Sequence, residues 1–77
     1  MPGSFDLELD ARGLNCPLPI LRTKKALSGM QSGKVLRILA TDQGATKDFQ
    51  AFAKQTGNEL ISASDSGDFL VFYLKKR

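Results

Sequence analysis

Apolar and polar residues alternate from Phe5 to Asp10, and this pattern predicts a β-strand with one buried face. From Pro17 to Met30 the apolar side chains recur every three or four residues, which predicts a helix. One side of that helix gathers Ile20, Thr23, Ala26, Leu27 and Met30. Arg22 and Lys25 fall on the opposite side, so the first helix is expected to pack one stripe against a core.

The rest of the chain continues this alternation of strands and helices. A nearly continuous apolar run at 35–41 predicts a central strand that is covered on much of both faces. After a turn at 42–44, a second helix ends at Gly57-Asn58, and its apolar stripe consists of Ala45, Phe49, Phe52, Ala53 and Thr56. Segments 59–64 and 69–74 read as two strands joined by a tight turn.

The order of the elements predicts an α/β (α+β) fold. The predicted order is strand, helix, strand, helix, strand, strand. This order fits a two-layer sandwich that has a mixed four-stranded sheet with both helices on one face. The last two strands form an antiparallel hairpin in this arrangement. The length of 77 residues predicts a single domain over 1–77, with a core at about 5–75.

Composition places this domain among globular proteins of a reducing compartment. Hydrophobic residues make up 42% of the chain, and its start lacks the basic and apolar regions of a signal peptide. No apolar run is long enough for a membrane span, so we expect a cytoplasmic location. The net charge of +3 equals the contribution of Lys75-Lys76-Arg77, which favours either a mild preference for acidic partners or a solvated tail. These basic residues do not form the dense basic stripe that is typical of a nucleic-acid binder, so no direct nucleic-acid contact is expected.

Cys16 is the one residue that could do covalent chemistry near neutral pH. The chain has one cysteine and no histidine, so it lacks an imidazole ligand, an obvious general base and an intramolecular disulfide. We therefore expect no metal and no cofactor. A free cysteine is also commonly a small buried hydrophobe, and that structural role is the alternative to a functional one.

Pro17 suits the first position of a helix, which places Cys16 at or next to the N-cap. The N–H groups of Leu18 and Ile20 would then point toward the thiol, and the helix dipole would lower its pKa. Arg12 and Arg22 could add positive potential.

Two prolines limit that effect. Pro17 and Pro19 each fix φ and each lack an N–H donor, so this helix start offers an anion fewer free N–H groups than usual. We expect a rigidly held and moderately activated thiol. Leu18 and Leu21 lie outside the core stripe and close to Cys16, where they form an apolar patch for a partner or are covered by the loop at 11–15.

Two segments of the chain form a recognisable pattern: Leu9-Asp10-Ala11-Arg12-Gly13-Leu14-Asn15-Cys16-Pro17-Leu18-Pro19, and Asp42 leading into Ala45-Thr46-Lys47-Asp48-Phe49. This pattern resembles the TusA-type (SirA-like) sulfur-carrier family. The resemblance covers nearly the whole chain. It implies a two-layer sandwich similar to the C-terminal domain of translation initiation factor 3. It also implies that Cys16 accepts sulfane sulfur as a persulfide from a cysteine desulfurase or a rhodanese-type donor, and passes it to an acceptor protein. In one branch of the family the sulfur reaches tRNA 2-thiouridine.

The residues themselves fit this chemistry. A sulfur carrier needs one nucleophilic thiol and no second cysteine, because a resolving thiol would expel the persulfide as a disulfide. We predict that the surface contacting partners comprises Arg12, Leu18, Leu21, Arg22 and Asp42. Gln43 stands where many family members carry proline, and Asn15 stands where some members carry a basic residue. The alternatives are a non-catalytic regulatory or RNA- or protein-binding module and a redox sensor that uses Cys16 sulfenic acid.

Overall fold

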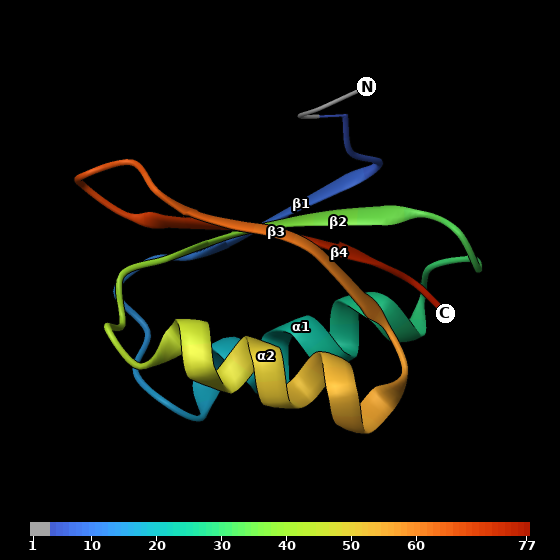
Figure 1. Cartoon of the computed structure of the whole chain (residues 1–77), viewed down its shortest axis with the longest axis horizontal. Helices are drawn as coiled ribbons and strands as arrows, with labels where there is room; N and C mark the ends of the chain where they lie inside the picture. The colour runs from blue at the N-terminus through green and yellow to red at the C-terminus, as the bar shows by residue number, and fades with distance from the viewer. Residues whose placement is uncertain (1–3) are drawn as a thin grey trace.

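The computed structural model describes residues 4–77, and its six elements follow the predicted order (Figure 1). They are β1 (Leu7–Ala11), α1 (Leu18–Ser28), β2 (Val35–Ala40), α2 (Ala45–Thr56), β3 (Glu59–Asp65) and β4 (Leu70–Lys75). The strands form one sheet in the order β1-β2-β4-β3, with β1 and β2 parallel and the other two pairs antiparallel. Both helices lie on one face of the sheet (Figure 1). The predicted mixed four-stranded, two-layer fold is confirmed. The expected domain range also includes residues 1–3, which lie outside the described residues.

Several element boundaries differ from the predicted ones by one or two residues. β1 covers 7–11 rather than 5–10, because its pairing with β2 begins at Leu7, opposite Leu36, and continues to Ala11. α1 covers 18–28 rather than 17–30, since Pro17 is its N-cap and Gly29 its C-cap. β3 extends one residue further than predicted, because Asp65 still pairs with Leu70, and β4 covers 70–75 rather than 69–74, since its pairing with β3 runs from Leu70 to Lys75.

The core lies between the inner face of the sheet and the two helices. Its largest fully buried side chains are Phe49, Phe72, Leu36, Ile38, Leu74 and Thr23. The centre of the Phe49 ring on α2 lies 4.6 Å from the centre of the Phe72 ring on β4 and 6.5 Å from that of the Phe52 ring. Both predicted stripes face this core, and β2 is the buried central strand that its apolar run indicated.

The parallel pairing of β1 and β2 decides where a site can form. Because the two strands run in the same direction, their carboxyl ends and the following loops meet at one edge of the sheet. We call these loops the Cys16 loop (residues 12–17) and the β2–α2 loop (residues 41–44). The N-termini of both helices lie at the same edge (Figure 1).

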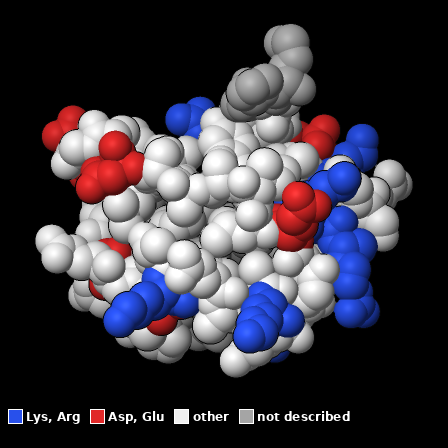
Figure 2. Space-filling model, in the orientation of Figure 1, with Lys and Arg blue, Asp and Glu red and all other residues white. Residues whose placement is uncertain are grey.

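The basic tail binds to the opposite end of the molecule. The Lys76 Nζ donates a hydrogen bond to the carbonyl of Leu27 near the end of α1, at 2.7 Å. The Arg77 side chain covers Gly57 at the end of α2. Cations at these positions interact favourably with the helix dipoles. Figure 2 shows Lys and Arg gathered toward this end, whereas the tip of the β3–β4 hairpin carries acidic side chains. No helix within residues 4–77 is long and apolar enough to cross a membrane.

Candidate functional site

Cys16 is exposed on the Cys16 loop, directly before the start of α1. The loop leaves β1 through Gly13, whose φ of 80° favours glycine, and the Cys16–Pro17 peptide is cis. The exposure is incompatible with the alternative that Cys16 is a small buried hydrophobe. The thiol can therefore be reached by another molecule.

Two hydrogen bonds fix the Cys16 loop to the β2–α2 loop. The N–H of Gly13 donates to the Thr41 hydroxyl oxygen, and the N–H of Cys16 donates to Asp42 Oδ2, both at 2.8 Å. The other oxygen of Asp42 accepts the N–H of Gly44 at 3.0 Å, next to the start of α2. One carboxylate thus holds the backbone of the cysteine and the beginning of the second helix in a fixed relation.

The start of α1 differs from the prediction. Pro17 is the N-cap and Pro19, which is buried, is the second residue of the helix. The N–H of Leu18 donates to the Asn15 carbonyl at 2.8 Å, and no side chain caps the helix. The expectation that the Leu18 N–H serves the thiol is therefore wrong, because a backbone carbonyl already occupies it.

The electrostatic environment of the thiol also differs from the prediction. The pKa of Cys16 is raised, first by a hydrogen bond from the thiol to the Asp48 carboxylate and then by partial desolvation. The negative charges of Asp48 and Asp42 add to the effect on this pKa. The prediction of a moderately activated thiol is therefore wrong in direction, because the negative charges of two carboxylates disfavour the thiolate.

Arg12, which was expected to add positive potential, is occupied by another partner. Its Nε and a terminal nitrogen donate to the two oxygens of Asp10, each at 2.8 Å, and its guanidinium lies 5.3 Å from the centre of the Phe69 ring. This pairing lowers the pKa of Asp10 to about 2 and raises the pKa of Arg12. The charge of Arg12 is thus largely compensated at the border of the site.

The two leucines outside the core stripe are exposed, as one of the two interpretations predicted. Leu18 is 43% and Leu21 53% exposed, so the Cys16 loop does not cover them. Arg22, the next residue of α1, is exposed as well. We call Leu18 and Leu21 the leucine patch. It places an apolar surface on the first turns of the helix that Cys16 precedes.

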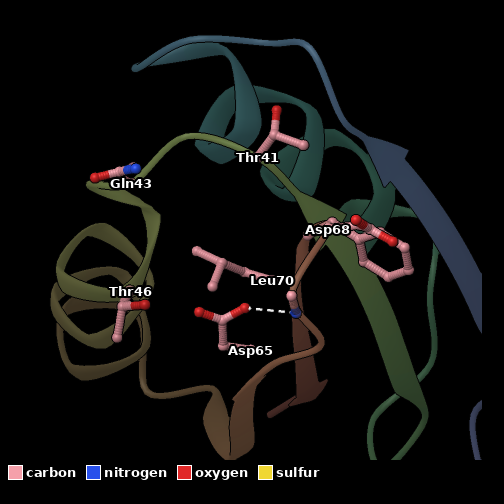
Figure 3. A pocket seen from close by; sticks show the side chains of 8 residues that line it. Thr41, Gln43, Thr46, Asp65, Asp68 and Leu70 are labelled. Atoms are coloured by element: carbon pink, nitrogen blue, oxygen red, sulfur yellow. Dashed lines mark hydrogen bonds between the residues drawn. The ribbon is translucent and has the colours of Figure 1, made fainter.

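A hollow of about 460 Å³ lies beyond the β2–α2 loop, between the start of α2 and the tip of the β3–β4 hairpin. In Figure 3, Thr46 on α2 faces Asp65 and Leu70 across this space. Thr41 lines it and also accepts the hydrogen bond from Gly13, so the hollow and the Cys16 loop share a wall. Within the described part of the chain, no group of three or more Cys, Asp or Glu side chains could hold a metal ion.

Asp48 is the residue of this site to which the sequence reasoning assigned no role. It lies in the first turn of α2, where its N–H donates to the Gly44 carbonyl at 3.1 Å. An acidic residue near the start of the second helix was a usable signal. If both helix starts are expected at one edge of the sheet, such a residue falls close to Cys16.

Comparison with known proteins agrees with this geometry. Residues 7–76 match the family model described as sulfurtransferase TusA. The sulfur carrier protein TusA of Allochromatium vinosum is 62% identical over 72 residues, which cover 94% of this chain and 95% of that protein. A putative sulfur carrier protein of Bacillus subtilis, YrkI, is 48% identical over 71 residues, covering 92% of this chain and 95% of the relative.

A solved structure shows the same fold. The crystal structure of a SirA-like protein from Desulfitobacterium hafniense superposes with a TM-score of 0.80 at 24% identity, covering 91% of this chain and 96% of that one. The family match and the two relatives establish the family, and the expected resemblance is confirmed: the chain belongs to the TusA family.

Proposed function

We propose that this protein is a sulfur carrier that accepts sulfane sulfur on Cys16 as a persulfide and passes it to a cysteine of an acceptor protein. The donor is a cysteine desulfurase or a rhodanese-type protein. The observation that carries the proposal is the exposed thiol on a loop that two hydrogen bonds fix to the neighbouring loop. The names of the relatives as sulfur carrier proteins support it.

The chemistry of loading needs only the groups that the chain provides and the donor. The Cys16 sulfur attacks the outer sulfur of a donor persulfide, and a new S–S bond forms while the bond between the two donor sulfurs breaks. The electron pair leaves with the inner donor sulfur, which takes up the proton that Cys16 gives up. No oxidant is needed, and no second cysteine of the chain can expel the carried sulfur as an intramolecular disulfide.

The leucine patch and its surroundings form the surface that partners contact in this proposal. Leu18, Leu21 and Arg22 are exposed on the helix that begins next to Cys16. Arg12 and Asp42 lie on the two loops that border the thiol. A partner must bring its own sulfur to Cys16, so it has to cover this surface during transfer.

Intact mass spectrometry tests the proposal. The protein is incubated with a cysteine desulfurase, its pyridoxal phosphate and cysteine, and we expect a gain of about 32 Da, one sulfur atom, that a thiol reductant removes. Cys16→Ser is the control and keeps the fold, because the residue is exposed. A wild-type protein without the added mass, or an equal gain on Cys16→Ser, would contradict the proposal. Delivery of the sulfur to tRNA 2-thiouridine stays a prediction of the resemblance.

A further inference from the structure

The outer side of β3 is an open edge of the sheet. β3 is the last strand in the order β1-β2-β4-β3, and within residues 4–77 no strand pairs with its outer side. All residues from Ile61 to Asp65 are exposed, and Ile61, which lies in a register shift between Leu60 and Ser62, is 48% exposed. An open edge presents backbone N–H and C=O groups with which an extended chain can pair.

The pairing of β3 with β4 determines which backbone groups face this edge. At the hairpin, the N–H of Ser66 donates to the Phe69 carbonyl at 3.0 Å, so these two residues form a hydrogen-bonded pair. Hydrogen-bonded and non-hydrogen-bonded pairs alternate along an antiparallel ladder. The next pair, Asp65 with Leu70, is therefore non-hydrogen-bonded, and so is the pair that Ala63 forms two residues further on. The N–H and C=O groups of Asp65 and Ala63 consequently point away from β4, toward the open edge.

The other side of β4 agrees with this assignment. Lys76 donates its N–H to the Lys34 carbonyl at 2.8 Å, where the antiparallel pairing of β4 with β2 continues. Leu70 and Phe72 lie an even number of residues before Lys76, so their backbone groups also face β2. These two residues are the partners of Asp65 and Ala63, and they do not bind to them through the backbone.

The two edges of the sheet differ in how they are protected against strand addition. On β1, which forms the opposite edge, Glu8 and Asp10 alternate with other residues and are both paired with arginines. Residues 60–64 of β3 include no charged residue, proline or glycine. Charges and prolines on edge strands commonly prevent strand addition, and the protective feature that β3 does carry is the register shift at Ile61. The half of β3 that follows this shift is therefore open to an extended segment.

The charges around the open edge favour a cationic occupant. Glu59 and Asp65 lie at the two ends of β3, and Asp68 follows in the hairpin tip, where Figure 2 shows acidic side chains. A second copy of the chain is disfavoured, because pairing through the backbone groups of Ala63 and Asp65 would bring the Asp65 carboxylates of both copies together. Lysine or arginine side chains on an incoming segment would instead be attracted to these carboxylates.

We propose that the outer edge of β3 binds an extended, cationic segment of a partner protein as a further strand of the sheet. Backbone hydrogen bonds to Ala63 and Asp65 hold the segment, and its cationic side chains lie beside Asp65 and Asp68. The hairpin tip projects toward the side of the molecule on which both helices begin (Figure 1), and Asp65 lines the hollow that shares a wall with the Cys16 loop. A segment bound here therefore leads its protein toward Cys16. That this partner exchanges sulfur with Cys16 rests on the proposed function, whereas the pairing itself does not.

The test is an NMR titration of the isotope-labelled protein with a short peptide that alternates threonine and valine between terminal lysines. The same peptide with terminal glutamates is the charge control. The lysine peptide should shift the amide signals of Ala63 and Asp65 and slow the exchange of these amides with solvent, and the glutamate peptide should bind several-fold more weakly. No binding of the lysine peptide at millimolar concentration, equal binding of both peptides, or shifts confined to other elements would overturn the proposal.

Two pairs of variants assign the binding to this edge. Ala63→Pro removes one outward N–H at a position where an edge strand tolerates proline, so the fold should persist while the lysine peptide binds about fivefold more weakly or worse, the value of one hydrogen bond. Ala63→Val keeps the N–H and should bind as wild type does. Asp65→Asn keeps an acceptor for the N–H of Gly67 but loses the charge, and should weaken binding about two- to fourfold. Glu8→Gln on β1 removes the same charge and should not weaken it.

Asp65→Asn keeps the proposal testable if Ala63→Pro does not fold, and unchanged affinity in either folded variant would overturn it. Sedimentation measures self-association of the wild-type protein, which should be monomeric; a dimer that Ala63→Pro dissociates would assign the edge to a second copy and overturn the cationic segment. None of these measurements involves sulfur. A failure here therefore leaves the carrier function standing, and a failure of sulfur loading leaves the peptide titrations interpretable.

Discussion

Replacing Asp42 by alanine should weaken both the fold and the fixed position of Cys16. The carboxylate is half-buried between two loops, and each of its oxygens accepts a backbone N–H, from Cys16 at 2.8 Å and from Gly44 at 3.0 Å. Alanine provides neither acceptor. Of the two hydrogen bonds named above between the Cys16 loop and the β2–α2 loop, the one from Gly13 to Thr41 then remains.

The expected loss of stability follows from these two bonds. A hydrogen bond within a protein contributes about 1 kcal/mol net, and water can partly replace the lost acceptors at a half-buried site. Asp42→Ala should therefore lower the free energy of unfolding by about 1–2 kcal/mol. In a domain of this size that corresponds to a decrease of about 5–15 °C in Tm. Asp65→Ala is the matched control, because it removes a carboxylate with one described N–H partner, Gly67.

Thermal and urea unfolding measure the loss of stability, and hydrogen exchange of the Cys16 amide measures its local part. That amide should exchange faster in Asp42→Ala, whereas in Asp65→Ala it should exchange at the wild-type rate. The thiol pKa should fall in Asp42→Ala, since one of the two carboxylates that raise it is gone. An Asp42→Ala protein as stable as Asp65→Ala, with an unchanged Cys16 amide, would refute the role assigned to Asp42.

Three further outcomes are expected. Leu21→Asp should slow sulfur loading several-fold while changing stability by less than about 0.5 kcal/mol, with Lys25→Asp on the same helix as the control; unfolding of Leu21→Asp would contradict the patch. The Asp10 carboxyl should titrate near pH 2 by NMR, and a midpoint near 4 would contradict its pairing with Arg12. Its contribution to the free energy of unfolding is therefore present above its ordinary pKa and is lost as the pH falls toward 2. The folded chain binds the Cys16 proton more tightly than the unfolded chain, so the stability of wild type relative to Cys16→Ser should fall as the pH rises above about 9; an increase would contradict the raised pKa.

The fold could be predicted because each segment carries its own periodicity. The stripe that includes Thr23 and Leu27 and the one that includes Phe49 and Phe52 face the core as the spacing required. Errors were confined to element ends, where pairing partners decide the boundary. Asp65 counts as a strand residue because Leu70 lies opposite, and a propensity for turns does not reveal this.

The thiol environment could not be predicted from local sequence because it depends on residues from a distant segment. The position of Pro17 correctly placed Cys16 just before a helix, and the leucine patch followed from the helical spacing. The sign of the pKa shift was wrong, since the charges of Asp42 and Asp48 act on the thiol from the β2–α2 loop and α2, which the parallel pairing of β1 and β2 brings to the same edge of the sheet. Arg12 was misjudged for a different, local reason, since Asp10 two residues earlier binds its guanidinium.

The most direct test of the central claim is the transfer of sulfur from the loaded carrier to a second protein. The protein is loaded by a desulfurase with cysteine that contains heavy-isotope sulfur, separated from the donor, and mixed with an acceptor protein that has a reactive cysteine. Intact mass spectrometry follows both proteins. If Cys16 carries the sulfur, the carrier should lose one heavy sulfur atom as the acceptor gains one, and Cys16→Ser should transfer none. A carrier that stays loaded, or an acceptor that gains sulfur equally well from Cys16→Ser, would contradict the claim.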